Sequence, residues 1–254
     1  MANDVNRKAG TLYIVATPIG NLEDMTLRAI RTLKEVDLVA CEDTRVTGQL
    51  LKHFGIEKPL ISYFQHSKLS KVEAIIEKLT NGQNIALVTD AGTPGISDPG
   101  QELIFKIKSQ ERKDLSPLSP TAKGGFEMGR DDIHGIRIVP IPGASALTAA
   151  ASVSGMIEKE FYFAGFLPKK KGRQTEFNKL KQLDCPIVIY ENTLRLPRTL
   201  NDIKSYFGAD AEVFIAREIT KMFEEYWGGT VDFVQADLKN HQMKGEVVLI
   251  IKHS

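Results

Sequence analysis

Short apolar runs alternate with segments of helical periodicity along most of the chain. Residues 11–16 form an apolar run that Pro18 and Gly20 interrupt, and apolar residues then recur every three or four positions over 27–33. The alternation continues to Ser154, with further strands predicted at 38–41, 60–64, 84–89 and 136–141. Because these strands are apolar on both faces and helices separate them, the pattern predicts a parallel-rich α/β sheet.

The periodicity stops between residues 109 and 135. This stretch is polar and rich in Ser, Pro, Gly and charged residues, and its few apolar residues follow neither the strand nor the helix period. A short helix is predicted before it at 101–108, and the strand at 136–141 follows it. We therefore predict a long surface loop, inserted at 109–135.

A second series of strands and helices begins with the aromatic segment 160–166. Further strands are predicted at 187–190, 212–217, 224–227 and 246–251, and helices at 175–183, 197–207 and 231–240. Gly228 and Gly229 predict a turn. The two series indicate two α/β domains, which we place at 1–157 and 158–254.

Composition adds few constraints. The 254 residues suffice for a sizeable core without disulfides, and Cys41 and Cys185 lack metal-ligand spacing, so we expect two buried thiols in a reducing compartment. No apolar run approaches the roughly 18 residues of a membrane span, and the first ten residues are polar and charged, which favours a cytoplasmic protein without a cleavable signal. The net charge of +1 neither demands nor excludes nucleic acid.

The strand at 84–89 leads into an unusual loop, residues 90–100, with the sequence DAGTPGISDPG. Five of its eleven residues are Gly or Pro, and backbone without side chains lets a small molecule approach closely. Ligands of open α/β sheets bind beyond the carboxyl ends of strands, so this loop predicts a ligand site. No dinucleotide or P-loop signature is present, which favours a neutral or cationic ligand near the carboxylates Asp90 and Asp98.

Several segments together resemble the small-subunit ribosomal RNA methyltransferases of the tetrapyrrole methylase superfamily. The resemblance covers nearly the whole chain and rests on TPIGNL at 17–22, CEDTR at 41–45, the loop at 90–100, PIPGASA at 140–146, FAGFLP at 163–168, YEN at 190–192 and AREITK at 216–221. It implies two α/β domains of the tetrapyrrole methylase type with the cofactor cleft between them. It also implies that a homodimer uses S-adenosylmethionine to methylate the ribose 2′-hydroxyl of a decoding-region cytidine in 16S rRNA, within the small ribosomal subunit.

The resemblance also implies which residues surround the cofactor. They are Pro18, Gly92, Thr93, Pro94, Ile96, Ser145, Ala146, Tyr190, Ala216 and Gly245. Superfamily members typically have Gly-Asp-Pro where this chain has Gly92-Thr93-Pro94, so an acidic contact to the cofactor is either lost or supplied by Asp90.

Methyl transfer from a sulfonium needs no metal, but a ribose hydroxyl is a weak nucleophile and calls for a general base. Glu42 and Asp43 follow a predicted strand and are candidates, with Arg45 beside them to grip a phosphate or hold a carboxylate. His66 is a further candidate base. The alternative reading is a helix N-cap with a surface ion pair at 42–45, and a loop histidine bonded to backbone at His66.

Lys169, Lys170, Lys171 and Arg173 place four cations within five residues. We expect them to contact RNA phosphates, which position a substrate without reading its sequence; the alternative is a solvated surface loop. Two other functions stay open. A tetrapyrrole C-methyltransferase would share the fold and cofactor but need neither this basic run nor the cluster at 42–45, and a non-catalytic RNA-binding or assembly factor would bind no S-adenosylmethionine.

Overall fold

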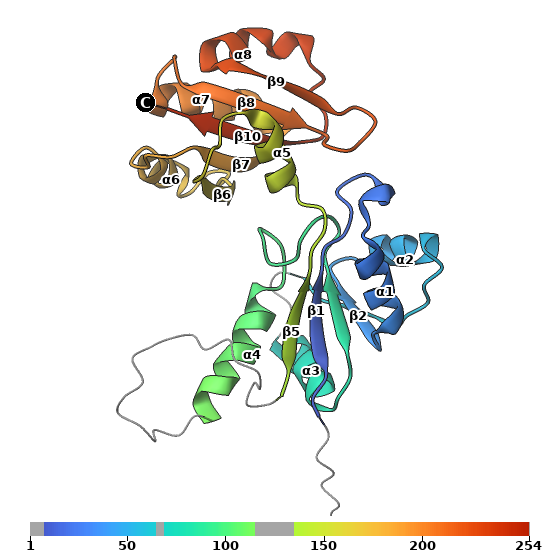
Figure 1. Cartoon of the computed structure of the whole chain (residues 1–254). Helices are drawn as coiled ribbons and strands as arrows, with labels where there is room; N and C mark the ends of the chain where they lie inside the picture. Colours follow the sequence, from blue (N-terminus) through green and yellow to red (C-terminus); the bar gives the residue numbers. More distant parts are fainter. Residues whose placement is uncertain (1–7, 65–68, 115–134, 254) are drawn as a thin grey trace, which may run out of the picture. The chain divides into compact units, whose positions relative to one another are not determined.

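The computed structural model describes residues 8–64, 69–114 and 135–253 (Figure 1). The chain divides into two compact units, each with its own sheet and core. The first unit comprises Met1–Pro18 and Leu22–Ala144, and the second comprises Ile19–Asn21 and Ser145–Ser254.

Helix α5 (Ala146–Ser154) belongs to the second unit, so the division falls before this helix and not at 157/158 as the sequence pattern suggested. Its apolar face carries Leu147 and Ala150, which pack against Val188 and Ile250 of the second sheet. The segment 155–159 after α5 marks the end of a helix, whereas the change of core occurs before α5.

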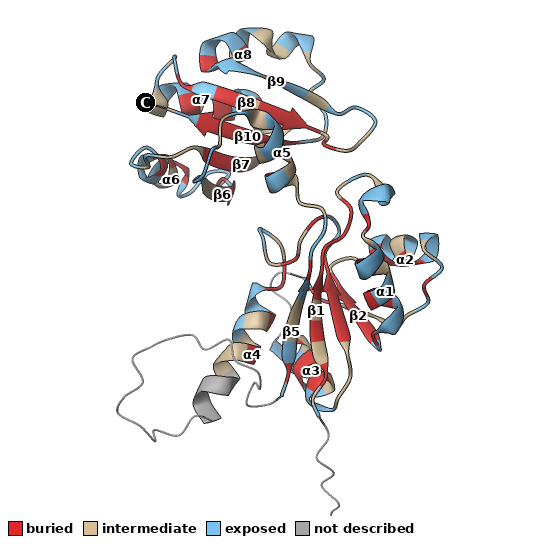
Figure 2. Cartoon of the chain, viewed as in Figure 1, coloured by how far each residue is buried: buried red, intermediate tan, exposed pale blue. Residues whose placement is uncertain are grey.

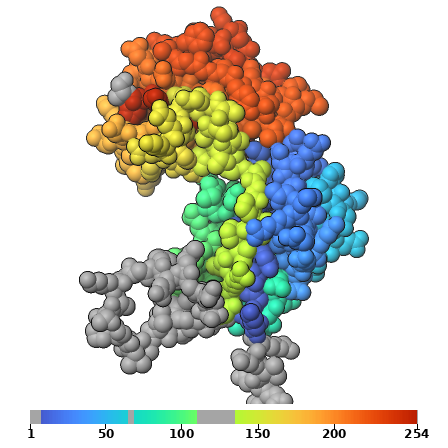
Figure 3. Space-filling view, viewed as in Figure 1, coloured from blue at the N-terminus to red at the C-terminus, as the bar shows by residue number. Residues whose placement is uncertain are grey.

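The first sheet has five strands in the order β3-β2-β4-β1-β5, and all neighbours run parallel. The strands β1 and β5, far apart in sequence, lie side by side, and their coloured surfaces adjoin in Figure 3. The strands are β1 (Thr11–Val15), β2 (Leu38–Cys41), β3 (Leu60–Ser62), β4 (Ile85–Val88) and β5 (Arg137–Ile141). Because they are parallel, the loops that follow them meet at one edge, as predicted.

Helices cover both faces of the first sheet. One face packs against α1 (Leu27–Glu35) and α2 (Thr44–His53), and the other packs against α3 (Leu69–Thr80) and α4 (Gln101–Asp114). This arrangement leaves β2 and β4 buried along their whole length (Figure 2). The near-continuous apolar strands of the sequence are thereby explained.

Helix α4 is longer than its periodicity predicts. It was expected to end at residue 108, but it continues to Asp114, so the start of the predicted loop at 109–135 is helical. The extension contains Gln, Glu, Arg and Lys, which favour helix even without an apolar face. The remainder of the predicted insertion, residues 115–134, lies outside the described residues.

The second sheet is mixed, in the order β6-β7-β10-β8-β9, with a parallel β6–β7 pair and antiparallel pairs elsewhere. Its strands are β6 (Tyr162–Phe166), β7 (Ile187–Asn192), β8 (Glu212–Arg217), β9 (Glu225–Thr230) and β10 (Glu246–Lys252). One face packs against α6 (Arg173–Leu180), α7 (Leu196–Phe207) and α8 (Val231–Asp237), and the other packs against α5.

Gly228 and Gly229 lie inside strand β9, not in the turn that two adjacent glycines predicted. A Cβ atom at Gly228 would stand 2.6 Å from the carbonyl oxygen of Val213 on the neighbouring strand. Close backbone approach therefore explains the glycine at this position.

The two cysteines are free, with Cys41 buried and Cys185 only half-buried. Cys185 is less enclosed than expected because it precedes β7 and does not lie within it. Over residues 8–64, 69–114 and 135–253, no cluster of His, Cys, Asp and Glu has the makings of a metal site, and no helix is long and apolar enough to cross a membrane.

His241 joins strand β9 to helix α8 through two carboxylates. Its Nδ1 lies 2.5 Å from Glu225 Oε1, its Nε2 lies 2.8 Å from Asp237 Oδ2, and its ring stacks on Trp227 at 4.1 Å. Burial opposes ionisation, but the hydrogen bonds and charges of Asp237 and Glu225 outweigh it and raise the pKa of His241 above its ordinary value of 6.5. The folded state thus favours the imidazolium.

We expect His241→Gln to lower the free energy of unfolding by about 1–2 kcal/mol at pH 6, because hydrogen bonds to charged groups are lost. The raised pKa means that this contribution is complete below pH 6.5 and disappears as the pH rises through the folded-state pKa. Urea titrations of wild type and variant between pH 5.5 and about 9 measure it. A difference that grows with pH would contradict the assignment.

Candidate functional site

The loops after β1 and β4 are joined at the carboxyl edge of the first sheet. The Thr17 N–H donates to Gly92 O at 2.9 Å, and the Gly92 N–H donates back to Thr17 O at 3.1 Å. The buried Thr17 hydroxyl also donates to the carbonyl of Thr89 at 3.1 Å. These bonds bring the TPIGNL and DAGTPG segments together, as the position of both after parallel strands requires.

Thr93 and Asp90 extend the connection to the loops after β5 and β2. The Thr93 hydroxyl donates to Ala144 O after β5 at 3.2 Å, and the Asp90 carboxylate accepts the Asp43 N–H after β2 at 3.1 Å. Thr93 therefore uses its hydroxyl to hold two loops together. The carboxylate of Asp90 is exposed, so it remains a candidate for the acidic contact to the cofactor.

Two positions of this edge require glycine. Gly92 has φ +87°, in the left-handed region that side chains disfavour. A Cβ at Gly143 would lie 2.9 Å from the Cβ of Ala16. Around them Pro18 and Pro94 are buried, while the Ile96 side chain is exposed and accessible to a ligand.

Asp43 opens helix α2 and is paired with Arg45. Its Oδ1 accepts the Arg45 N–H at 2.8 Å, and its Oδ2 lies 2.6 Å from Arg45 Nη2. These hydrogen bonds to Arg45 lower the pKa of Asp43 to about 2. A carboxylate stabilised so strongly in its ionised form is a poor proton acceptor. The contacts of Asp43 are those of a helix N-cap with an ion pair, the alternative interpretation of this cluster.

Glu42 differs from its neighbour. It is half-buried, and burial together with the negative charges of Asp90 and Asp43 raises its pKa above the ordinary value of 4.5. A raised pKa makes a carboxylate a stronger base near neutral pH. Glu42 is therefore the better candidate base, whereas His66 lies outside the described residues.

Four of the expected cofactor residues come together in the second unit. Tyr190 and Ala216 flank Val248 on adjacent strands, and α5 covers this face of the sheet. The Leu147 N–H donates to the Tyr190 hydroxyl at 3.1 Å, which fixes the first turn of α5 over the sheet. Ser145 and Ala146 stand at that first turn, so the grouping follows from one helix on one sheet face.

Gly245 lies apart from α5, at the start of β10. Its carbonyl accepts the Thr193 N–H at 3.1 Å and the Thr193 hydroxyl at 2.9 Å. With φ +100° and a Cβ position 2.4 Å from Glu218 Oε1, this site accepts only glycine. The expected cofactor residues thus form two groups, one in each unit. Gly245 lies beside the sheet that carries the second group.

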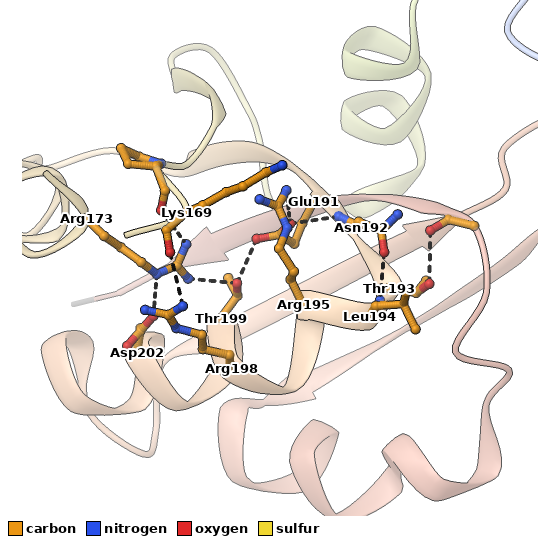
Figure 4. A network of polar contacts seen from close by, with 12 residues as sticks. Lys169, Arg173, Glu191, Asn192, Thr193, Leu194, Arg195, Arg198, Thr199 and Asp202 are labelled. Atoms are coloured by element: carbon orange, nitrogen blue, oxygen red, sulfur yellow. Dashed lines mark hydrogen bonds and ion pairs between the residues drawn. The ribbon is translucent and has the colours of Figure 1, made fainter. Parts of the chain in front are cut away.

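Arg173 corrects the predicted set of phosphate contacts. Its side chain is only 6% exposed, because its guanidinium donates to Asp202 at 2.7 Å, to Thr199 at 2.8 Å and to the Pro168 carbonyl at 3.2 Å (Figure 4). All three nitrogens of its guanidinium therefore donate hydrogen bonds within the second unit. The side chains of Lys169, Lys170 and Lys171 are exposed and remain the cations of this loop.

Glu191 is a buried charge that the sequence pattern missed. Its fully enclosed carboxylate accepts hydrogen bonds from the Thr199 hydroxyl at 2.8 Å and the Asn192 N–H at 2.8 Å, and it pairs with Arg195 at 2.5 Å (Figure 4). Thr199 therefore links Arg173 to Glu191. The sequence signal that could have revealed this buried charge is a charged residue at the end of an apolar run that forms a strand.

The sequence matches the family described as Tetrapyrrole (Corrin/Porphyrin) Methylases over residues 11–114 and 126–234. A relative from Synechocystis named ribosomal RNA small subunit methyltransferase I is 44% identical over 243 residues, which are 95% of this chain and 78% of that protein. This similarity extends through both units.

Solved structures share the fold at low sequence identity. The methyltransferase CobJ has a TM-score of 0.65 at 15% identity, with 97% of this chain and 95% of that chain covered. A Thermus thermophilus uroporphyrin-III C-methyl transferase, complexed with S-adenyl homocysteine, has a TM-score of 0.59 at 14% identity, with 95% and 97% covered.

Proposed function

Because the chain belongs to the tetrapyrrole methylase family and is an S-adenosylmethionine-dependent methyltransferase, we propose that it methylates the ribose 2′-hydroxyl of a decoding-region cytidine in 16S rRNA. The observation that carries this proposal is the 44% identity to a relative named ribosomal RNA small subunit methyltransferase I. The exposed Lys169–Lys171 loop supports an RNA substrate over a tetrapyrrole. We propose further that the enzyme is a cytoplasmic homodimer acting within the small ribosomal subunit.

The residues present fit S-adenosylmethionine, a cationic ligand without a phosphate. The loop after β4 offers backbone without a Cβ atom at the half-buried Gly95, and the exposed carboxylate of Asp90 suits a positively charged group. In the first unit Pro18, Gly92–Pro94 and Ile96 would hold the cofactor. In the second unit Ser145, Ala146, Tyr190, Ala216 and Gly245 would do so. When bound, the cofactor supplies an electrophilic methyl group.

Positioning and one proton transfer make up the contribution of the protein. Glu42 would accept the proton that the ribose hydroxyl loses when its oxygen takes the methyl group and the carbon–sulfur bond of the sulfonium breaks, and the pKa raised by burial favours that proton transfer. Arg45 has a side chain that is 86% exposed and paired with Asp43, and we propose that it contacts an RNA phosphate.

The function is tested with radiolabelled S-adenosylmethionine and three acceptors: free 16S rRNA, assembled small subunits and uroporphyrinogen. We expect label in RNA, at a ribose oxygen when nuclease digests are examined by mass spectrometry. Transfer to uroporphyrinogen alone would support the tetrapyrrole alternative. Calorimetry without S-adenosylmethionine binding would support the non-catalytic one.

Replacing Lys169, Lys170 and Lys171 together by Ala is expected to weaken RNA binding. Three lost phosphate contacts lower the slope of log K against log salt concentration by about 2 for single-stranded RNA. Fluorescence anisotropy at several salt concentrations measures both quantities.

The matched control replaces three other exposed lysines of the second unit, Lys181, Lys239 and Lys252, by Ala. This variant loses the same charge, so a general electrostatic effect would change both proteins equally. If the two variants had equal salt slopes, the Lys169–Lys171 loop would not be part of the RNA contact surface.

A further inference from the structure

A groove of about 490 Å³ opens in the second unit, between the basic loop, the start of α6 and helix α7. Its polar walls include Lys170, Lys171 and Gln174 from the loop and α6, and Arg198, Ser205 and Tyr206 from α7. This volume is within the range of sites that hold a nucleotide-sized ligand.

The groove is cationic. Its single lining carboxylate, Asp202, is paired with Arg173 at 2.7 Å, so these two charges cancel. Within the part of the chain that the structure describes, Lys170, Lys171 and Arg198 have no carboxylate partner. Three cations therefore face the groove without neutralisation, which favours an anionic ligand.

Hydrogen bonds from two arginines hold this wall in place. Arg198 Nη1 donates to the Lys169 carbonyl at 3.0 Å, and Arg173 Nη1 donates to the Pro168 carbonyl at 3.2 Å (Figure 4). Arg173 is itself fixed to α7 through Asp202 and Thr199. The start of the basic loop is thus fastened to α7, so the groove does not have to be ordered when a ligand binds.

The groove also has an aromatic wall. Tyr206 is half-buried, and its ring stacks on Phe177 with centroids 5.1 Å apart and an interplanar angle of 18°. Gln174 and Ser205 add exposed hydrogen-bonding groups. Cations, amide and hydroxyl groups and an aromatic side chain match the chemistry of a nucleotide within a single RNA strand.

We propose that this groove binds a phosphodiester and its nucleotide in the RNA substrate, as a contact additional to the nucleotide that is methylated. The proposal rests on the proposed function for the identity of the RNA. It assigns Arg198 and Gln174, which lie outside the lysine run, to RNA binding. It also gives Arg173 a positioning role in place of a phosphate contact.

The test is Gln174→Glu, with Gln182→Glu as its matched control. Both side chains are exposed and belong to the second unit, but only Gln174 lines the groove. A carboxylate in the first turn of α6 suits the helix dipole, so the fold is retained. We expect about fivefold weaker binding of a 5′-labelled single-stranded fragment of 16S rRNA for Gln174→Glu, and an unchanged affinity for Gln182→Glu.

The outcomes separate this inference from the proposed function. Equal RNA affinities of the two variants would show that the groove does not bind RNA, even if the wild type methylates 16S rRNA. A wild type that binds this RNA but methylates neither free 16S rRNA nor assembled small subunits would refute the proposed function, while a selective loss of RNA affinity in Gln174→Glu would still support the groove. If Gln174→Glu weakened the binding of inorganic pyrophosphate but not the binding of RNA, the groove would be a site for a free anion and the proposal would be wrong.

Discussion

Glu42→Gln is expected to lower kcat about 10²- to 10⁴-fold while leaving the affinity for S-adenosylmethionine unchanged. The amide keeps the shape of the side chain but cannot accept the proton of the ribose hydroxyl. Single-turnover methylation and calorimetry of the cofactor separate the two quantities. A wild-type rate would exclude Glu42 as the base and make His66 the next candidate.

The pH profile provides a second readout of the same role. Burial and the charges of Asp90 and Asp43 raise the pKa of Glu42, and only the ionised carboxylate acts as a base. Activity of the wild type should therefore fall as the pH drops through this raised pKa. The residual activity of Glu42→Gln should lack that limb.

Asp43→Asn is the matched control for Glu42→Gln. Asparagine is as good an N-cap as aspartate, so α2 should be retained, and the pKa of about 2 makes Asp43 a weak base in the wild type. We expect a much smaller loss of turnover from Asp43→Asn than from Glu42→Gln. A larger loss of turnover from Asp43→Asn than from Glu42→Gln would identify Asp43 as the residue that accepts the proton.

Thr199→Val is expected to lower the free energy of unfolding by about 3–6 kcal/mol. The side chains are nearly isosteric, but valine removes a buried hydroxyl that donates to Glu191 at 2.8 Å and accepts from Arg173 at 2.8 Å. Two charged groups, both largely enclosed, thereby lose a hydrogen-bond partner, and such bonds are worth about 1.5–3 kcal/mol each.

The control for this variant is Thr175→Val, an exposed threonine on helix α6 of the same unit. It should change the free energy of unfolding by less than about 0.5 kcal/mol. Denaturant titration followed by circular dichroism compares the two proteins. Equal stabilities would show that the Arg173–Thr199–Glu191 network does not stabilise the second unit.

The elements of the fold could largely be predicted, because local periodicity reflects burial on a strand or helix. The central strands β2 and β4 begin and end within a residue of their predicted bounds. The differences arise where partners are distant in sequence. α5 packs on a sheet formed later in the chain, and Gly228 is required by the backbone of β8.

By itself, the sequence determined the parallel first sheet, the loops that meet at its carboxyl edge and the family to which the chain belongs. Only the tertiary structure decided which charged residues are available for chemistry. Asp43 and Glu42 are neighbours, yet Arg45 stabilises the charge of one while burial and Asp90 disfavour the charge of the other. Arg173 follows three exposed lysines, yet contacts with Thr199 and Asp202 bury it. The reason is physical: ionisation and exposure depend on groups that folding brings near, and no local pattern encodes them.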